Sequence, residues 1–194
     1  MKMKILLPLA LIGLMIACGP STQISKSWTD PSWKPGSVVP FKKVLVIAAL
    51  KNESSRRIAE DKIVAAIKKI VAVQSYNYIQ PTETDQNMLE AKLKKDGFDG
   101  LILMRLQDVD KSVSYTPGTS YGGWYGYRHY DPGYYSEDKT FYVETNFYSL
   151  DQQKLLWSGT TSTLNPTQVD QTISDIITAI KNELISKGLI PADK

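Results

Sequence analysis

Cysteine and histidine are almost absent from this chain: among 194 residues there is one of each, Cys18 and His129. A single cysteine excludes an internal disulfide framework and a cysteine metal cluster, and a single histidine leaves no ligand set for zinc. We therefore expect no metal site and no cofactor. A basic excess is also lacking, because the formal net charge of +3 falls to +1 once Lys2 and Lys4 are removed with a signal segment. We expect no nucleic-acid partner.

A hydrophobic run long enough to span a bilayer is lacking as well. The apolar stretch at residues 5–17 has thirteen residues, which as a helix would cover about 20 Å of a hydrocarbon core about 30 Å thick. It follows the short basic segment Met1-Lys2-Met3-Lys4. This pattern predicts a signal peptide over residues 1–17 and not a spanning helix.

The apolar stretch ends at Met15-Ile16-Ala17-Cys18. This tetrapeptide resembles the lipobox of bacterial lipoproteins, with Met15 where leucine is preferred. The resemblance implies that the signal is cut before Cys18, that the Cys18 sulfur is lipidated and its amino group acylated, and that a lipid bilayer is a partner. Gly19 is not the aspartate that retains such proteins at the inner membrane of enteric bacteria. The resemblance therefore implies the outer membrane, with the domain facing the periplasm or, as the alternative, the cell surface. An ordinary secretory signal that contains a cysteine is the alternative to lipidation.

Residues 18–40 are predicted to be the lipidated cysteine and a tether, followed by a single domain at residues 41–190. The tether is rich in Ser, Thr, Pro and Gly, as linkers are. It also contains Trp28 and Trp33. Because large aromatic side chains are mostly buried, we expect the segment to fold back and bury one of these indoles on the domain.

The domain is predicted to be α/β, with a three-layer-like mixed sheet in the order β-α-β-α-β-β-β-α. Its central strand is the apolar run at residues 44–50, which has no polar alternation and is typical of a strand covered on both faces. A buried helix segment is the alternative, but the β-branched residues favour a strand. A second such run at 101–104 predicts a parallel first half, and a tight turn at 151–154 predicts an antiparallel second half. The expected strands are 44–50, 71–79, 101–115, 140–148 and 155–163, and the expected helices are 56–70, 85–95 and one opened by Asn165-Pro166 and ended by Gly188.

Three motifs carry a further resemblance: Trp-Thr-Asp-Pro at 28–31, Phe-Lys-Lys-Val-Leu-Val-Ile at 41–47 and Glu-Thr-Asn-Phe-Tyr at 144–148. With the lipobox they resemble a family of small, uncharacterised bacterial lipoproteins, which implies no established activity. The element order is similar to that of the amino-terminal domain of the Tol-Pal translocation protein, of the lipoprotein activators of penicillin-binding proteins and of the curli secretion lipoprotein. These envelope proteins work by contacting other proteins, although a fold alone does not determine a function.

An aromatic-rich loop is predicted at residues 116–139. Seven aromatic residues fall within fifteen positions, and the glycines and proline among them exclude a regular helix. Connections of this length are often functional, and Tyr and Trp provide large contact areas with few rotatable bonds. The alternative is a flap that is flexible or packs on itself at the antiparallel edge. The candidate partner-binding residues are Tyr121, Trp124, Tyr125, Tyr127, Tyr130, Tyr134 and Tyr135.

Catalytic groups are sparse. His129 has no second histidine or cysteine with which to bind a metal, so a solvated or stacked loop residue is expected. Asp108 and Asp110 share a strand face, and paired carboxylates can do acid–base work or hold calcium. No partner accompanies them, so we expect a surface position. The turn Asn52-Glu53-Ser54-Ser55 offers helix caps but no glycine, and with neither phosphate-binding fingerprint present we expect no nucleotide there.

The sequence therefore predicts a membrane-anchored envelope lipoprotein that acts as a non-catalytic binding or scaffolding component, with an envelope protein as its partner. One alternative is a module that binds glycan or peptidoglycan through the aromatic loop. The weakest alternative is a hydrolase with an unrecognised site. No catalytic residue is assigned, and an enzyme is not expected.

Overall fold

The structure is a computed structural model that describes residues 22–36, 41–80, 85–117, 120–122, 128–130 and 133–192. Among these residues, no helix is both long enough and apolar enough to cross a bilayer. The strands are β1 (Thr22–Thr29), β2 (Lys43–Ala49), β3 (Val71–Gln74), β4 (Gly100–Thr116), β5 (Ser120–Gly122), β6 (Arg128–Tyr130), β7 (Tyr134–Ser149) and β8 (Lys154–Leu164), and the helices are α1 (Glu53–Ala66), α2 (Ser75–Tyr78), α3 (Gln86–Lys95) and α4 (Val169–Ser186).

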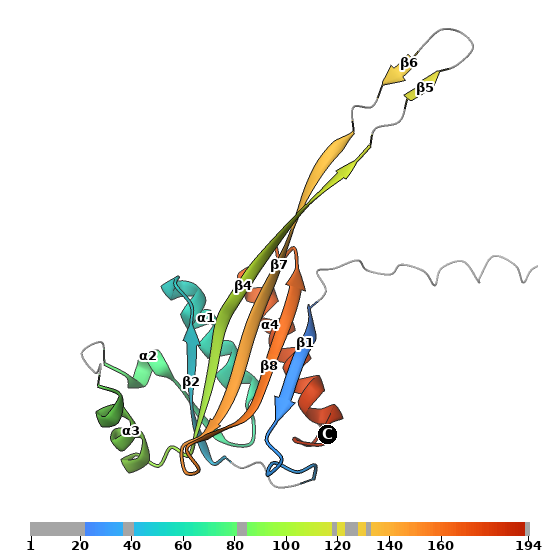
Figure 1. Cartoon of the computed structure of the whole chain (residues 1–194). Helices are drawn as coiled ribbons and strands as arrows, with labels where there is room; N and C mark the ends of the chain where they lie inside the picture. Colours follow the sequence, from blue (N-terminus) through green and yellow to red (C-terminus); the bar gives the residue numbers. More distant parts are fainter. Residues whose placement is uncertain are drawn as a thin grey trace, which may run out of the picture.

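Six of the strands form one mixed sheet in the order β1-β8-β7-β4-β2-β3, and β5 pairs separately with β6. The predicted α/β class, with a parallel first half and an antiparallel second half, is confirmed. In the parallel half, β2 lies between β3 and β4 and runs parallel to both. Helices α1 and α4 cover one face of the sheet, whereas α2 and α3 lie beside β2 and contact the other face (Figure 1).

The central strand β2 is buried on both faces. Val44, Leu45 and Val46 have no exposed surface, because each face of the strand meets a different apolar cluster: Val44 and Val46 pack toward α1 and α4, and Leu45 packs with residues of α3. A strand in this position needs no polar alternation. The prediction made from the apolar run at 44–50 is confirmed.

The amino-terminal edge of the sheet corrects the predicted tether. Residues 22–29 form β1, which pairs antiparallel with β8 from Thr22 opposite Thr163 to Thr29 opposite Trp157. The domain therefore starts at or before Thr22 and not at residue 41. Local composition could not show this, because an edge strand with one face in water tolerates Ser, Thr and Lys. The expectation that one indole is buried is confirmed for Trp33, which is 5% exposed.

Three predicted boundaries also change. Helix α1 ends at Ala66 and not at residue 70, because the backbone at Ile67 is extended. The strand predicted at 71–79 ends at Gln74, where the helical turn α2 begins. Asn165 does not cap the last helix. Its backbone has a φ of +47°, and its side chain accepts a hydrogen bond from the Lys139 N–H at 2.8 Å, which closes the end of the β7–β8 pairing.

Candidate functional site

Strands β4 and β7 continue well beyond the rest of the sheet. The last pair between β2 and β4 joins Ala49 to Arg105, and the last pair between β7 and β8 joins Thr140 to Leu164. Beyond both points, residues 111–116 of β4 pair with residues 134–139 of β7 and with no other strand of the described ranges. We call this two-stranded segment the arm. Its six residue pairs extend it by about 20 Å, and it projects from the body of the domain (Figure 1).

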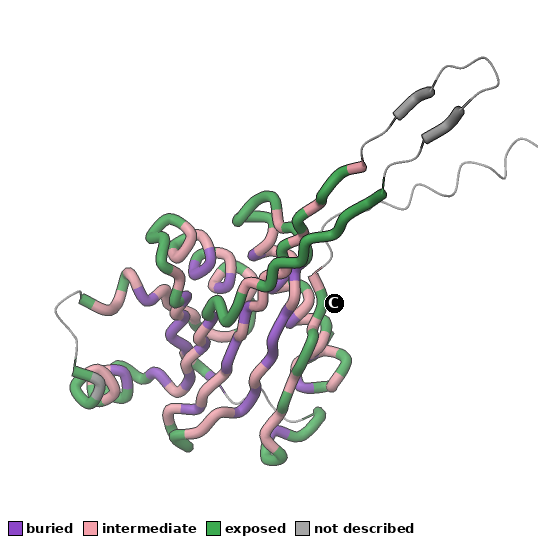
Figure 2. Tube along the Cα trace, turned by 45° about the horizontal axis from the view of Figure 1, so that its top comes forward, coloured by how far each residue is buried: buried purple, intermediate pink, exposed green. Residues whose placement is uncertain are grey.

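The two faces of the arm differ in chemistry. Val113 and Tyr115 on β4 share a face with Tyr135 on β7, and the Tyr115 and Tyr135 rings lie directly opposite each other with centroids 4.7 Å apart. All three are exposed, by 69%, 49% and 75%. The opposite face carries Ser114 and Ser136, which are paired with each other, and near its end it carries the exposed Tyr134, which is paired with Thr116. Most of the described length of the arm is exposed (Figure 2), so one face of a solvated ribbon presents an apolar cluster.

Exposed ion pairs lie at the base of the arm. Glu137 lies 3.9 Å from the Lys111 ammonium and 3.5 Å from that of Lys139, and exposed ion pairs of this kind contribute little stability. An isolated two-stranded ribbon is marginally stable in water. Both of its outer edges also present backbone N–H and C=O groups that a further strand can pair with. The arm therefore has the features of a surface that gains stability by binding.

The predicted loop of residues 116–139 is shorter than expected, because β4 reaches Thr116 and β7 starts at Tyr134. Of the candidate aromatics, Tyr134 and Tyr135 lie on the arm and are exposed. The backbones of Tyr121 and Tyr130 belong to β5 and β6, with Tyr121 opposite His129. Their side chains lie outside what the structure describes, as do the whole residues Cys18, Trp124, Tyr125 and Tyr127.

Val113 and Tyr115 were missed from the sequence. The signal that could have found them is the alternation of Lys111-Ser112-Val113-Ser114-Tyr115, which predicts a strand with one apolar face. Without a partner strand in view, the same alternation is also compatible with an ordinary half-buried hairpin. Only the register shows that, within the described part of the chain, no third strand pairs with the arm.

Asp108 and Asp110 lie on β4 below the arm and are exposed. The chain bulges between Leu106 and Asp108, and the Asp108 carboxylate accepts a hydrogen bond from the neighbouring Val109 N–H at 2.8 Å. Over the described ranges, no three His, Cys, Asp or Glu side chains gather as a metal site would require. The geometry gives this pair a surface position without a catalytic partner.

A buried carboxylate that the sequence analysis did not single out lies where β2 and β3 end. Glu60 of α1 has no exposed surface and accepts hydrogen bonds from the Ala48 N–H at 3.1 Å, the Ser75 hydroxyl at 2.7 Å and the Tyr76 N–H at 3.2 Å. Parallel sheets often bind ligands at this edge. Here the protein's own donors use the carboxylate oxygens, so Glu60 joins α1, β2 and α2 structurally.

At the start of α1, the surface above Glu60 is a network of charged side chains. Hydrogen bonds from Arg56 and Arg57 lower the pKa of Glu53 to about 2. Arg56 also lies 3.8 Å from Glu60. Because both arginines are engaged by carboxylates of the same helix, this turn is not arranged as a free anion site.

No protein-family model matches the chain, and no curated protein sequence matches it. Similar solved structures include a PelC dodecamer from Paraburkholderia phytofirmans, with 12% identity, a TM-score of 0.44, and coverage of 89% of this chain and 100% of that one. The lipoprotein GNA1162 from Neisseria meningitidis has 12% identity and a TM-score of 0.40, over 75% of this chain and 99% of that one.

TolB from Acinetobacter baumannii has 13% identity and a TM-score of 0.39, over 90% of this chain and 33% of that one. TolB and a lipoprotein are the kinds of envelope protein that the sequence resemblance named. At these identities and TM-scores, the likeness assigns neither a family nor a function. Membership of a family of uncharacterised lipoproteins is not shown.

Proposed function

We propose that this protein is a lipid-anchored component of the bacterial cell envelope that binds another envelope protein through the apolar face of the arm, without catalysis. The observation that carries the proposal is the exposed cluster of Val113, Tyr115 and Tyr135 on one face of the ribbon. Aromatic residues with an apolar body and a polar tip are enriched in the cores of protein interfaces. Covering them removes apolar surface from water, which is the main favourable term in association.

The free backbone edges of the arm support the same proposal. A partner can add a strand to either edge, so that main-chain hydrogen bonds supply affinity and the apolar side chains supply specificity. The charged pair of Lys111 and Glu137 at the base of the arm limits unspecific edge-to-edge pairing. A protein partner can form hydrogen bonds with the backbone edges and also bury the apolar face, whereas a sugar ring would contact only the exposed aromatic rings.

The register also relates the arm to the predicted lipid anchor. Thr22 pairs with Thr163, and Thr163 pairs with Phe141, so the start of β1 lies in the same row of the sheet as the residues just below the arm. Four peptide units separate Cys18 from Thr22, which limits their Cα atoms to a separation of about 14 Å. A lipid on Cys18 would hold this end of the domain close to the bilayer. We therefore propose a partner that lies at the same membrane.

The test compares two double variants in the protein's own cells. Val113→Ser with Tyr135→Ser removes the apolar face, and Ser114→Ala with Ser136→Ala alters the opposite face as a matched control. After chemical cross-linking, the wild type and the control should capture the same envelope protein, and the first variant should capture at least ten-fold less. All three should melt within about 2 °C of one another, because exposed substitutions change stability little.

Identical captures by the two variants would contradict the proposal. A variant with the apolar face removed that keeps its protein partner but no longer binds isolated peptidoglycan sacculi would instead support the glycan-binding alternative. Turnover of a labelled wall fragment by the wild-type protein would overturn the non-catalytic part of the proposal.

A further inference from the structure

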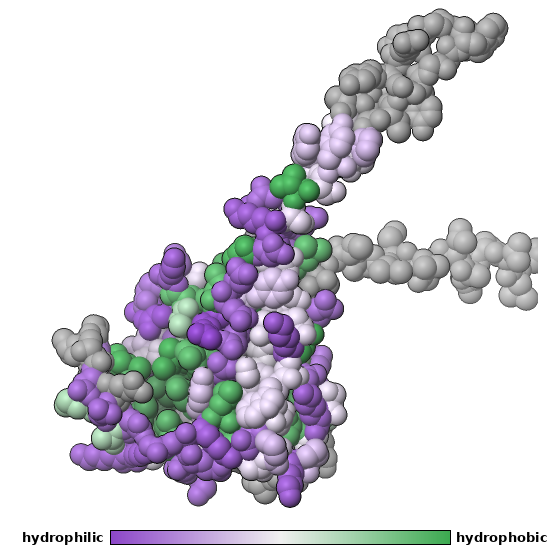
Figure 3. Space-filling view, in the orientation of Figure 1, coloured by the Kyte–Doolittle hydropathy of each residue, from purple (hydrophilic) through white to green (hydrophobic). Residues whose placement is uncertain are grey.

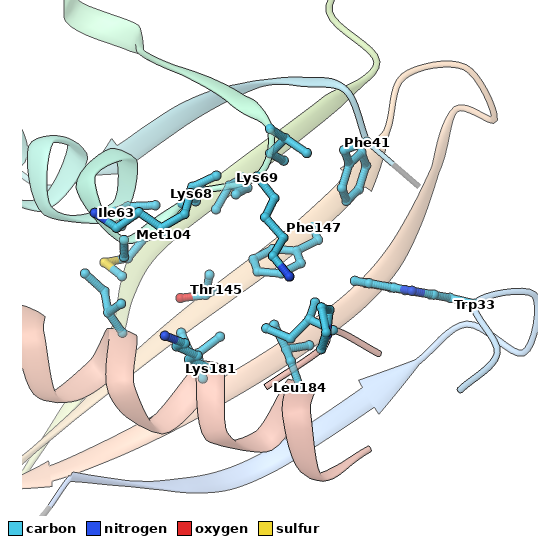
Figure 4. Close-up of a pocket in the computed structure, with 18 residues that line it drawn as sticks. Trp33, Phe41, Ile63, Lys68, Lys69, Met104, Thr145, Phe147, Lys181 and Leu184 are labelled. Atoms are coloured by element: carbon cyan, nitrogen blue, oxygen red, sulfur yellow. The ribbon is translucent and has the colours of Figure 1, made fainter. Parts of the chain in front are cut away.

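A cavity of about 200 Å³ lies between the sheet and helices α1 and α4, on the face opposite to α2 and α3 (Figure 4). It is separate from the arm and from the Glu60 cluster. Thr145 and Phe147 of β7 form its floor, and α4 forms one wall with the stripe Ile177, Ile180, Lys181 and Leu184. The opposite wall is the segment 67–70 that follows α1.

The early end of α1 creates this cavity. Because the helix stops at Ala66 and Ile67 is extended, the segment 67–70 passes over the sheet as a loop where another helical turn would have packed against α4. The apolar side chains of Ile177, Ile180 and Leu184 on α4 therefore face a gap, which is the cavity. Its remaining walls are almost entirely hydrophobic, and an apolar cavity of about 150 Å³ in a protein core is large enough to bind benzene.

The charged residues of the lining are all lysines: Lys68, Lys69 and Lys181. Lys68 and Lys69 are exposed at the mouth, and Figure 4 shows the Lys69 side chain reaching from the loop toward Phe147. Among the residues that the structure describes, no carboxylate lines the cavity. The mouth therefore combines positive charge with an apolar interior, which is complementary to an amphipathic anion.

A buried polar group gives a second and independent indication of a ligand. Thr145 is 2% exposed, and its hydroxyl has no hydrogen-bond partner in the described part of the chain. It lines the cavity, where Figure 4 shows it between the sheet and Lys181. Leaving a buried hydroxyl unpaired is unfavourable, so the hydroxyl is available as a donor to a ligand oxygen.

We propose that this cavity binds one unbranched alkyl chain that carries a terminal anionic group, as in a medium-chain fatty acid. The chain occupies the apolar interior. Its carboxylate lies beside the Lys68 and Lys69 ammonium groups and accepts a hydrogen bond from the Thr145 hydroxyl. Scaled from the cavity that holds benzene, the volume accommodates about eight carbon atoms.

The first experiment is a chain-length series measured by isothermal titration calorimetry, below the micelle concentration of each ligand. It uses the full chain with Cys18→Ser, purified without detergent. From hexanoate to octanoate, each added methylene should tighten binding about four-fold, and the gain should stop at about nine carbons, when about eight alkyl carbons fill the cavity. Absence of binding by octanoate and decanoate at millimolar concentration, or a gain that continues without a plateau, would overturn the proposal.

The second experiment tests the charge and the hydroxyl with decanoate and the matched cation decyltrimethylammonium. The cation should bind at least ten-fold more weakly than decanoate. Lys68→Ala with Lys69→Ala should weaken decanoate binding about five-fold, whereas Lys26→Ala with Lys51→Ala removes two exposed lysines elsewhere and should leave it unchanged. Equal binding of anion and cation, or equal effects of the two lysine pairs, would overturn the proposal.

The Thr145→Val variant keeps nearly the same volume but removes the hydroxyl. It should weaken decanoate about three-fold and leave the chain-length dependence unchanged. An unchanged affinity would overturn the assigned hydrogen bond. Comparison of decanoate with decyl phosphate distinguishes the source of the head group: tighter decanoate indicates a free fatty acid, and tighter decyl phosphate indicates a phospholipid fragment with a single chain. Both outcomes support an anionic alkyl ligand.

Discussion

Replacing Glu60 by alanine should strongly destabilise the domain. The substitution leaves three donors without their acceptor: the Ala48 N–H of β2, and the Ser75 hydroxyl and Tyr76 N–H of α2. An unsatisfied buried donor costs about 1–3 kcal/mol, but water can enter the space that the side chain leaves. We therefore expect a loss of about 4 kcal/mol, a large part of the 5–15 kcal/mol that stabilises a typical domain.

For a domain of this size, that loss corresponds to a decrease in Tm of about 12 °C. The assay is urea unfolding followed by tryptophan fluorescence, with a thermal melt alongside. Asp61→Ala is the matched control, because Asp61 is the next residue of α1 and is exposed, so its loss should cost less than about 1 kcal/mol. A Glu60→Ala variant as stable as this control would refute the structural role that we assign to the buried carboxylate.

Three further predictions concern the sheet and its edges. Gly159→Ala should cost about 1–3 kcal/mol in urea unfolding, because the new methyl group would overlap the fully buried ring of Trp157. The stabilisation that wild type has over Asp30→Asn should be constant at neutral pH and shrink between pH 4 and pH 2 in thermal melts. Hydrogen bonds from Ser32 lower the pKa of Asp30 from 3.8 to about 2, so the stabilisation is present above the unfolded pKa and is lost as pH falls through the folded one. Asn165→Ala should increase amide exchange at Lys139 at least ten-fold, because it removes the acceptor of that N–H.

Each of these has a clear contrary result. A Gly159→Ala protein with unchanged stability would mean that the ring can move in a way the packing does not indicate. A wild-type advantage over Asp30→Asn that grows toward low pH would contradict the direction of the pKa shift. Unchanged exchange at Lys139 would show that the Asn165 side chain does not close the sheet edge.

Much of the fold follows from local pattern. The unbroken apolar run of β2 requires cover on both faces, and the structure provides it. Gly188, which the sequence marks as a helix end, has the left-handed backbone that favours glycine, with φ of +67°, and so does Gly97 after α3, with φ of +77°. The side chain of Asn52 caps α1 through the Ser55 N–H at 2.9 Å. In these cases the residue interacts with groups only a few positions away in the chain, so its role can be predicted from the neighbouring sequence.

The features that local pattern could not reveal depend on distant segments. The composition of β1 is as polar as that of a tether, and the segment forms a strand because it pairs with the edge of β8. Glu60 looks like one charge among several on α1, and its burial depends on where α2 begins. The arm exists because the pairing of β2 with β4 and of β8 with β7 stops before these two strands end. The cavity exists because α1 ends at Ala66. Figure 3 shows hydrophilic surface at the base of the arm and a hydrophobic patch just beyond it.

The central claim is that the apolar face of the arm contacts a partner protein, and site-specific photo-cross-linking tests it most directly. A photoreactive phenylalanine analogue is placed at Tyr135 on the apolar face or at Ser136 on the opposite face, in cells that make the lipid-anchored protein. Our account predicts a discrete adduct with one envelope protein from position 135 and little or none from position 136. Equal adducts from both positions, or none from either, would contradict it.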